Sequence, residues 1–183
     1  MTNAKLAGQR YTSIKRTGWD ALKLFSLDLT ENLLNLDDIE VLSHDLELLE
    51  LAFNEIRQVK IHNIDSYNTL QYLDLSWNYI SGDSLPMLGK LKNVRMLNLS
   101  SNRIDEFEID YDDFPNLFHL KMKSNRLKSG CFHQFKKIES LQELYLNDNQ
   151  IQQIPLLGDD QSHIALSNLR LLDLSDNPIR VSF

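Results

Sequence analysis

The chain has 183 residues, of which 42% are hydrophobic and 25% are charged, and its formal net charge is −7. That length is sufficient for one domain with a substantial core. The acidic balance argues against general nucleic-acid binding, because phosphate contacts need a basic surface. The sequence contains no run of about 18 apolar residues, so it predicts no membrane-spanning helix.

The first 23 residues are polar and contain no apolar signal-peptide core. They also lack the repeating pattern that fills the rest of the chain. Tyr11, Ile14 and Trp19 are apolar side chains that would suffice to cover the open face of the first repeat. Residues 1–23 are therefore predicted to form an N-terminal cap segment.

From residue 24 onward, the pattern L-x-x-L-x-L-x-x-N-x-L/I recurs seven times, with Val94 and Met122 as conservative departures. The copies begin at residues 24, 46, 70, 94, 117, 141 and 169, so the period runs from 22 (24 to 46) to 28 (141 to 169). Alternate residues of an extended strand point to opposite faces, so the leucines of L-x-L face inward. A single short strand buries too little apolar surface to be stable, whereas stacked copies form a parallel ladder around a continuous core.

Each copy closes on an asparagine, where the chain turns sharply after the strand. A carboxamide has two donors and an acceptor, so it can bridge backbone groups of neighbouring coils that would otherwise be buried without partners. We interpret these asparagines as structural, not catalytic. They are Asn32, Asn54, Asn78, Asn102, Asn125, Asn149 and Asn177.

The returns between the strands also carry a pattern. An apolar residue stands seven positions after the asparagine in every repeat that has a return, and several repeats have a second one three positions later. Spacing by three favours 3-10 turns or short helices laid against the core. The strongest predictions for a helical turn fall on residues 84–91 and 132–138.

The repeated frame resembles the leucine-rich repeat, whose period is about 20–29 residues. The resemblance implies an α/β solenoid with seven parallel strands on its concave face and short 3-10 or helical turns or loops on its convex face. Residues 24–183 would form this domain. Repeats two, four and six read I-x-x-V/F/I after the asparagine. This is similar to an intracellular short-repeat subtype found in a regulatory subunit of protein phosphatase one, an axonemal dynein light chain and tubulin-folding cofactor E.

Cysteine usage and the resemblance together suggest a compartment. Cys131 is the single cysteine, so no disulfide forms within the chain. Extracellular leucine-rich repeats usually have cysteine-rich caps, which are absent from this sequence. A reducing compartment is therefore expected. The cytoplasm is favoured, with the cilium, the cytoskeleton or the nucleus as alternatives.

Enzymatic chemistry has no support in the sequence, and neither a cofactor nor a metal site is predicted. Cys131 and His133 are two positions apart but have no third group at ligand spacing. A glycine-rich phosphate loop is also missing. We therefore expect a protein that is not an enzyme.

The solvent-facing strand positions follow from the frame, and on repeats two to six several of them carry aromatic, apolar or basic side chains. Such side chains dominate the energy of protein interfaces. The alternative is that they pack on one another along the ladder. The predicted protein-binding residues on the concave face are Leu48, Glu50, Phe53, Tyr72, Asp74, Trp77, Met96, His119, Lys121, Lys123 and Tyr145.

Charge is also unevenly distributed, with six acids between residues 105 and 113 and four bases between residues 121 and 128. These runs indicate either pairing of charges across repeats or a bipolar docking surface.

The sequence therefore favours a non-catalytic module that binds another protein on its concave sheet, without nucleic acid or membrane as partner. The alternatives are a structural scaffold of a large ciliary or cytoskeletal assembly, or a regulatory subunit of a phosphatase or ligase. Only six residues follow Asn177. Either Val181 and Phe183 form a lid over the C-terminal edge of the solenoid, or a partner or a further chain is expected to cover it.

Overall fold

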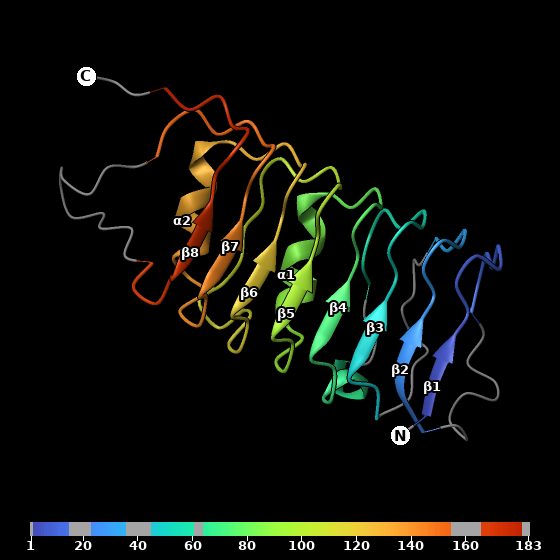
Figure 1. Ribbon diagram of the computed structural model, residues 1–183. Helices are drawn as coiled ribbons and strands as arrows, with labels where there is room; N and C mark the ends of the chain where they lie inside the picture. Colours follow the sequence, from blue (N-terminus) through green and yellow to red (C-terminus); the bar gives the residue numbers. More distant parts are fainter. Residues whose placement is uncertain (1, 15–22, 36–44, 61–63, 155–165, 181–183) are drawn as a thin grey trace.

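The computed structural model describes residues 2–14, 23–35, 45–60, 64–154 and 166–180. Within these residues the chain forms one parallel sheet of eight strands, and each strand lies beside the next in chain order (Figure 1). The strands are β1 (Thr2–Lys5), β2 (Leu24–Asp28), β3 (Leu48–Glu50), β4 (Tyr72–Asp74), β5 (Met96–Asn98), β6 (His119–Lys121), β7 (Glu143–Tyr145) and β8 (Leu171–Asp173).

The register of the sheet follows the leucine frame. Leu49 on β3 pairs with Leu73 on β4, and Leu73 pairs with Leu97 on β5. The middle leucine of each of these strands is buried, whereas the residues on either side of it are only half-buried. The predicted alternation between core and solvent is therefore confirmed.

The returns contain short helical turns. Those described are η1 (Ile64–Tyr67), η2 (Gly82–Ser84), α1 (Leu85–Gly89), η3 (Ser129–Cys131) and α2 (Phe132–Phe135). The two labelled helices α1 and α2 lie behind the sheet in the view of Figure 1. The helical turns expected at residues 84–91 and 132–138 are confirmed, and each follows directly on a 3-10 turn. Leu85, Leu88, Phe132 and Phe135 are buried and close the core from this side.

All seven asparagines of the frame make the bonds expected of them. Each side-chain amide donates to a carbonyl of its own strand end and to the matching carbonyl of the preceding coil, and each side-chain oxygen accepts a backbone N–H from that coil. The donations to the preceding coil are recorded for Asn32, Asn54, Asn78, Asn102, Asn125, Asn149 and Asn177.

The N-terminal segment contains an eighth strand, which the leucine frame did not predict. β1 pairs with β2, and Ala4 stands opposite Leu27. Asn32 donates to the Leu6 carbonyl at 2.9 Å and accepts from the Tyr11 N–H at 3.0 Å. Residues 2–11 therefore form a further coil of the ladder, with alanine in place of a frame leucine. The expected number of seven strands is one too low.

Gln9 takes the place of the frame asparagine in this coil. Gly8 precedes it with a φ of 69°, the left-handed conformation that the residue before each frame asparagine also adopts. Ile14 packs against the core, whereas Tyr11 is exposed. Trp19, the third residue of the predicted cap, lies outside the described residues. A boundary between cap and repeats at residue 24 stays a prediction.

Candidate protein-binding surface

The structure places the eleven predicted binding residues on the outward face of the sheet or at the ends of its strands. We call this surface the sheet face. Phe53, Trp77 and Lys123 are exposed, and the other predicted residues are half-buried. Half-burial reflects contact with neighbouring side chains along the ladder. The contacts of each pair show whether its residues only pack on one another or also remain open to a partner.

Phe53 and Trp77 form one such contact, which we call the stacked pair. Their ring centroids are 5.0 Å apart and the ring planes differ by 9°. Packing does not hide them, because 48% of Phe53 and 56% of Trp77 remain exposed. The stack therefore presents a flat apolar surface to solvent.

The backbone of the stacked pair is strained. Phe53 and Trp77 both have a φ of 55°, in the left-handed region. That conformation costs about 1–2 kcal/mol for a residue with a side chain, and bulky residues rarely adopt it. Asp148 and Asp176 occupy the same position in later repeats, and short polar side chains tolerate it better. Two large aromatic residues therefore stand where the backbone favours small polar ones.

A shallow open groove of about 720 Å³ continues from the stacked pair along the ends of the strands. Tyr79 lies within it, with the Arg103 guanidinium 4.4 Å from its ring centroid and that of Arg57 5.9 Å away. Leu33 and Arg126 also line the groove. The leucine frame gave no signal for these residues, although Tyr79 and Arg103 each follow directly on a frame asparagine.

Carboxylates cross the sheet face beside the stacked pair. Asp28 pairs in register with Glu50, and Glu50 with Asp74. We call these three residues the carboxylate row. Asp74 accepts hydrogen bonds from the Ser76 hydroxyl at 2.6 Å and from the Asn98 amide at 2.9 Å. Neutral donors therefore satisfy Asp74.

The carboxylate of Glu50, in the middle of the row, has no hydrogen bond or ion pair within the described part of the chain, although the Glu50 backbone carbonyl accepts the Leu29 N–H at 2.9 Å. Partial burial raises the pKa of its carboxyl, and the like charges of Asp28 and Asp74 raise it further, while Lys5 opposes the shift. Glu50 is thus a half-buried carboxylate between two others.

Tyr72 lies next to the row on the sheet face. Its hydroxyl donates to Asp74 Oδ2 at 3.3 Å. Burial, followed by the negative charges of Asp74 and Glu50, raises the pKa of the Tyr72 phenol to about 12. Leu48 and Met96 flank it in register on the neighbouring strands. An apolar row therefore borders the carboxylates on the side away from the stacked pair.

His119, Lys121 and Tyr145, three of the four predicted residues of repeats five and six, make side-chain contacts within this part of the sheet face. His119 Nδ1 lies 2.7 Å from Glu143 Oε2, and the Tyr145 hydroxyl donates to the same oxygen at 3.2 Å. Lys121 Nζ lies 5.8 Å from the centroid of the Tyr145 ring. The charged groups of Lys121 and Glu143 therefore have contacts within the protein, in contrast to the carboxylate of Glu50.

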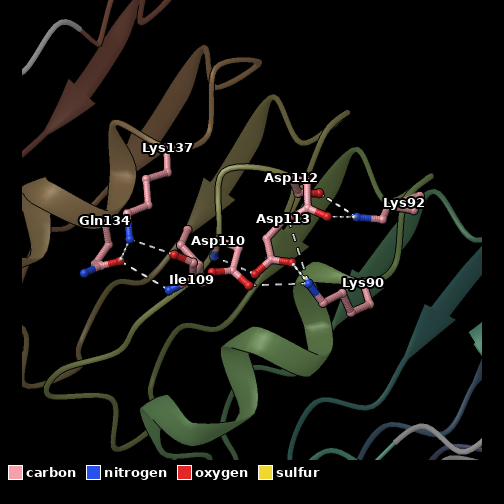
Figure 2. A network of polar contacts seen from close by, with 8 residues as sticks. All are labelled: Lys90, Lys92, Ile109, Asp110, Asp112, Asp113, Gln134 and Lys137. Atoms are coloured by element: carbon pink, nitrogen blue, oxygen red, sulfur yellow. Dashed lines mark hydrogen bonds and ion pairs between the residues drawn. The ribbon is translucent and has the colours of Figure 1, made fainter.

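The acidic run of residues 105–113 pairs across repeats, but not with the basic run. Figure 2 shows Asp110, Asp112 and Asp113 gathered about Lys90 and Lys92 from the preceding return. Lys90 Nζ lies 2.7 Å from Asp113 Oδ1, and Lys92 Nζ lies 3.8 Å from Asp112 Oδ2. Within the described residues, no ion pair joins the acids of residues 105–113 to the bases of residues 121–128. Pairing across repeats therefore accounts for part of the acidic run.

Cys131 is buried, and burial raises the pKa of its thiol to about 12, so it is protonated at neutral pH. Across the part of the chain that the structure describes, no group of three or more His, Cys, Asp or Glu side chains is arranged to hold a metal ion. None of the helices in that part has the length and apolar character needed to cross a membrane.

Comparison with known proteins identifies the class of protein that this fold defines. A model of the leucine-rich repeat matches residues 44–104, and a second model of two such repeats matches residues 139–182. The chain belongs to the leucine-rich repeat family. Proteins of this family are generally non-enzymatic interaction modules, and their domains typically serve protein–protein interaction.

Several characterised relatives align with most of the chain. Osteomodulin from Bos taurus is 29% identical, with 87% of this chain and 36% of osteomodulin aligned. X-ray radiation resistance-associated protein 1 from Mus musculus is 29% identical, with 83% and 22% aligned. Epiphycan from Homo sapiens is 29% identical, with 78% and 44% aligned. The chain thus spans less than half the length of each of these proteins.

Solved structures share the fold. Internalin C2 from Listeria monocytogenes covers 98% of this chain with 73% of its own, at a TM-score of 0.70 and 22% identity. TLR13, solved in a complex with ssRNA13, covers 90% with 23% of its own chain at a TM-score of 0.74 and 26% identity. The ectodomain of GASSHO1/SCHENGEN3 from Arabidopsis thaliana, solved with CASPARIAN STRIP INTEGRITY FACTOR 2, covers 85% with 19% of its own chain at a TM-score of 0.61 and 26% identity.

The expected intracellular location is wrong. Osteomodulin, epiphycan and mimecan are secreted extracellular matrix proteins, which points away from the cytoplasm, the cilium and the nucleus. The expectation depended on a single cysteine and on the resemblance to an intracellular repeat subtype. One cysteine excludes only a disulfide within these 183 residues; it does not define the redox state of the surroundings.

Proposed function

We propose that this chain is a non-catalytic protein-binding module whose partner docks on the sheet face of repeats two to four. The partner's contact surface would be centred on the stacked pair and bordered by Leu48, Tyr72 and Met96. The groove past Tyr79 would extend the contact toward the ends of the strands.

One observation carries this proposal: two large aromatic side chains are held half-exposed in a backbone conformation that disfavours them. Stability alone would favour asparagine, aspartate or glycine at both positions. Strained residues tend to cluster where function requires them, and Trp is prominent among residues that anchor interfaces. Binding gives a reason for the aromatic pair that packing does not.

Two further facts support a protein as the partner. GASSHO1/SCHENGEN3 was solved with CASPARIAN STRIP INTEGRITY FACTOR 2, which gives one example of a ligand held by this fold. TLR13 was solved with ssRNA13, but the net charge of −7 and the carboxylate row oppose phosphate here. The partners of longer relatives do not transfer to a chain that spans so little of their length.

The test uses peptides selected against the wild-type chain from a random display library. In the double variant Phe53→Ser/Trp77→Ser, the selected peptides should bind about 30-fold more weakly, which corresponds to about 2 kcal/mol. The thermal midpoint should be unchanged or higher, because serine adopts the left-handed conformation at lower cost than a bulky aromatic residue.

Tyr111→Ser is the matched control. Tyr111 is also an exposed aromatic residue, but it lies in a return rather than on a strand, and Lys137 approaches its ring. Its replacement should leave peptide binding unchanged. Selected peptides that bind the double variant as tightly as the wild type, or a double variant that unfolds, would refute the stacked pair as an anchor.

A further inference from the structure

The two halves of the sheet face differ in how their charges are met. Lys121 stands over Tyr145, and Glu143 receives His119 and Tyr145. On the other half, the carboxylate row runs across three adjacent strands, and the carboxylate of Glu50 has no hydrogen bond or ion pair among the described residues. Glu50 is therefore the member of the row whose charge is unmatched.

Like charges directly opposite on neighbouring strands destabilise a sheet. Strands lie about 4.8 Å apart, so Glu50 has a carboxylate-bearing neighbour at that spacing on each side. Lys5 stands beside the row on β1. Its charge lowers the pKa of Glu50, but it pairs in register with Asp28 and not with Glu50. A positive group placed over Glu50 would relieve repulsion from both sides at once.

Apolar surface flanks this position on both sides. Tyr72 and Leu48 border the row toward the start of the strands, and the stacked pair borders it toward their ends. A ligand that matched the whole surface would therefore combine positive charge with apolar side chains. A bare metal ion is a poor match, because the described carboxylates do not form a metal-binding group.

We propose that the partner presents a lysine or arginine side chain to Glu50, with apolar side chains of the same segment seated on Phe53 and Trp77. This inference rests on the proposed function and names the chemistry of its partner. A long basic side chain suits the site because its aliphatic stem covers apolar surface while its charged end reaches the carboxylate. Arginine can also stack on an aromatic face.

The experiment selects peptides on the wild-type chain and measures their affinity for the wild type, Glu50→Gln and Glu50→Lys. Glutamine keeps the shape of the side chain and removes its charge, so the fold should be retained. Wild-type peptides should be enriched in lysine or arginine next to apolar residues, and should bind Glu50→Gln about tenfold more weakly. Peptides selected on Glu50→Lys should lose the basic preference.

Glu106→Lys is the control for net charge. Glu106 is exposed in a return. Replacing it with lysine changes the total charge by the same amount as Glu50→Lys does. It should leave both the affinity and the composition of the selected peptides unchanged. Equal effects of Glu106→Lys and Glu50→Lys would mean that general charge, not the site, draws basic peptides, and would overturn the inference.

The remaining outcomes separate this inference from the proposed function. Peptides that require Phe53 and Trp77, but show no basic enrichment or bind Glu50→Gln normally, sink the inference and leave the function standing. Peptides that bind without the stacked pair refute the function and the inference with it. Failure to select any peptide on the sheet face counts against both.

Discussion

The frame asparagines link neighbouring coils of this solenoid through hydrogen bonds. The Asn78 amide donates to the carbonyls of Leu51, Leu75 and Ser76 at 2.9, 3.1 and 3.0 Å, and its oxygen accepts from the Ile56 N–H at 3.0 Å. These backbone groups lie where the chain turns and cannot join a strand ladder. The short side chain of asparagine carries two N–H donors and an oxygen acceptor, which the side chains of aspartate and leucine do not.

Asn78→Ala should destabilise the chain by about 3 kcal/mol, because buried backbone groups lose their partners. Asn177→Ala is the matched comparison. Asn177 makes the same kinds of bonds, but its surroundings are only half-buried. Water can replace the lost bonds there, so the cost should be about 1 kcal/mol. Urea unfolding of both variants measures the difference, and equal losses would contradict the role of burial.

At the scale of elements, the short helix α1 is attached to the following return by a buried acid. Figure 2 shows Asp113 between Lys90 and Asp110. The Asp113 side chain is fully buried, its Oδ1 lies 2.7 Å from Lys90 Nζ, and its Oδ2 accepts the Asp110 N–H at 2.9 Å. Gly89 permits this approach, because a Cβ there would lie 2.6 Å from Asp113 Cβ and Cγ.

Lys90→Met should destabilise the chain at neutral pH by about 2 kcal/mol. Breaking a buried ion pair typically costs 3–5 kcal/mol, and partial exposure of Lys90 reduces that loss. Lys92→Met removes a more exposed pair with Asp112 and should cost less than about 1 kcal/mol. Chemical unfolding of the two variants tests the contrast. A smaller loss for Lys90→Met than for Lys92→Met would show that Asp113 does not depend on this cation.

The same pair has a pH dependence with a defined sign. The hydrogen bond to Asp113 raises the pKa of Lys90 above its usual 10.5. The folded state therefore holds the proton more tightly than the unfolded state. The contribution is fully present below pH 10.5 and is lost as pH rises through the higher folded value. The stability difference between wild type and Lys90→Met should shrink over that range.

For the whole molecule, the frame was enough to predict the solenoid, its register and the structural role of the asparagines. It missed the first coil because Ala4 and Gln9 replace a leucine and the asparagine. Backbone pairing with β2 and Asn32 still builds that coil. A coil can therefore form where its residues no longer match the leucine frame.

The candidate site was predicted in position but not in its internal contacts. The position of each residue within the frame placed Phe53, Trp77 and Glu50 toward solvent, as the structure does. The frame cannot show which side chains pair along the ladder. It therefore treated Lys121 and Glu50 alike, although Lys121 stands over Tyr145 and the Glu50 carboxylate has no hydrogen bond or ion pair among the described residues. Tyr79 and Arg103 were missed because they follow the asparagine and lie beyond the strand.

The last repeat is less covered than the repeats in the middle of the described solenoid. Leu172, the middle leucine of β8, is 38% exposed, whereas its counterpart Leu73 on β4 is 2% exposed. The N–H groups of Leu75 and Trp77 donate to carbonyls of the next repeat, both at 2.9 Å. Within the described residues, the equivalent N–H groups of Leu174 and Asp176 have no such acceptor. In a linear array, stability depends on contacts with both neighbours.

Unfolding of the 183-residue chain should therefore begin at its seventh repeat. Hydrogen exchange should show the amides of residues 172–179 exchanging faster than those of residues 73–80, with Leu174 and Asp176 among the fastest. The matched comparison of Leu174 with Leu75 removes the effect of residue type, since both are leucines at the same place in the frame. Equal protection of these two amides would show that the seventh repeat is covered as well as the third, and the expectation of a partner over the C-terminal edge would then fail.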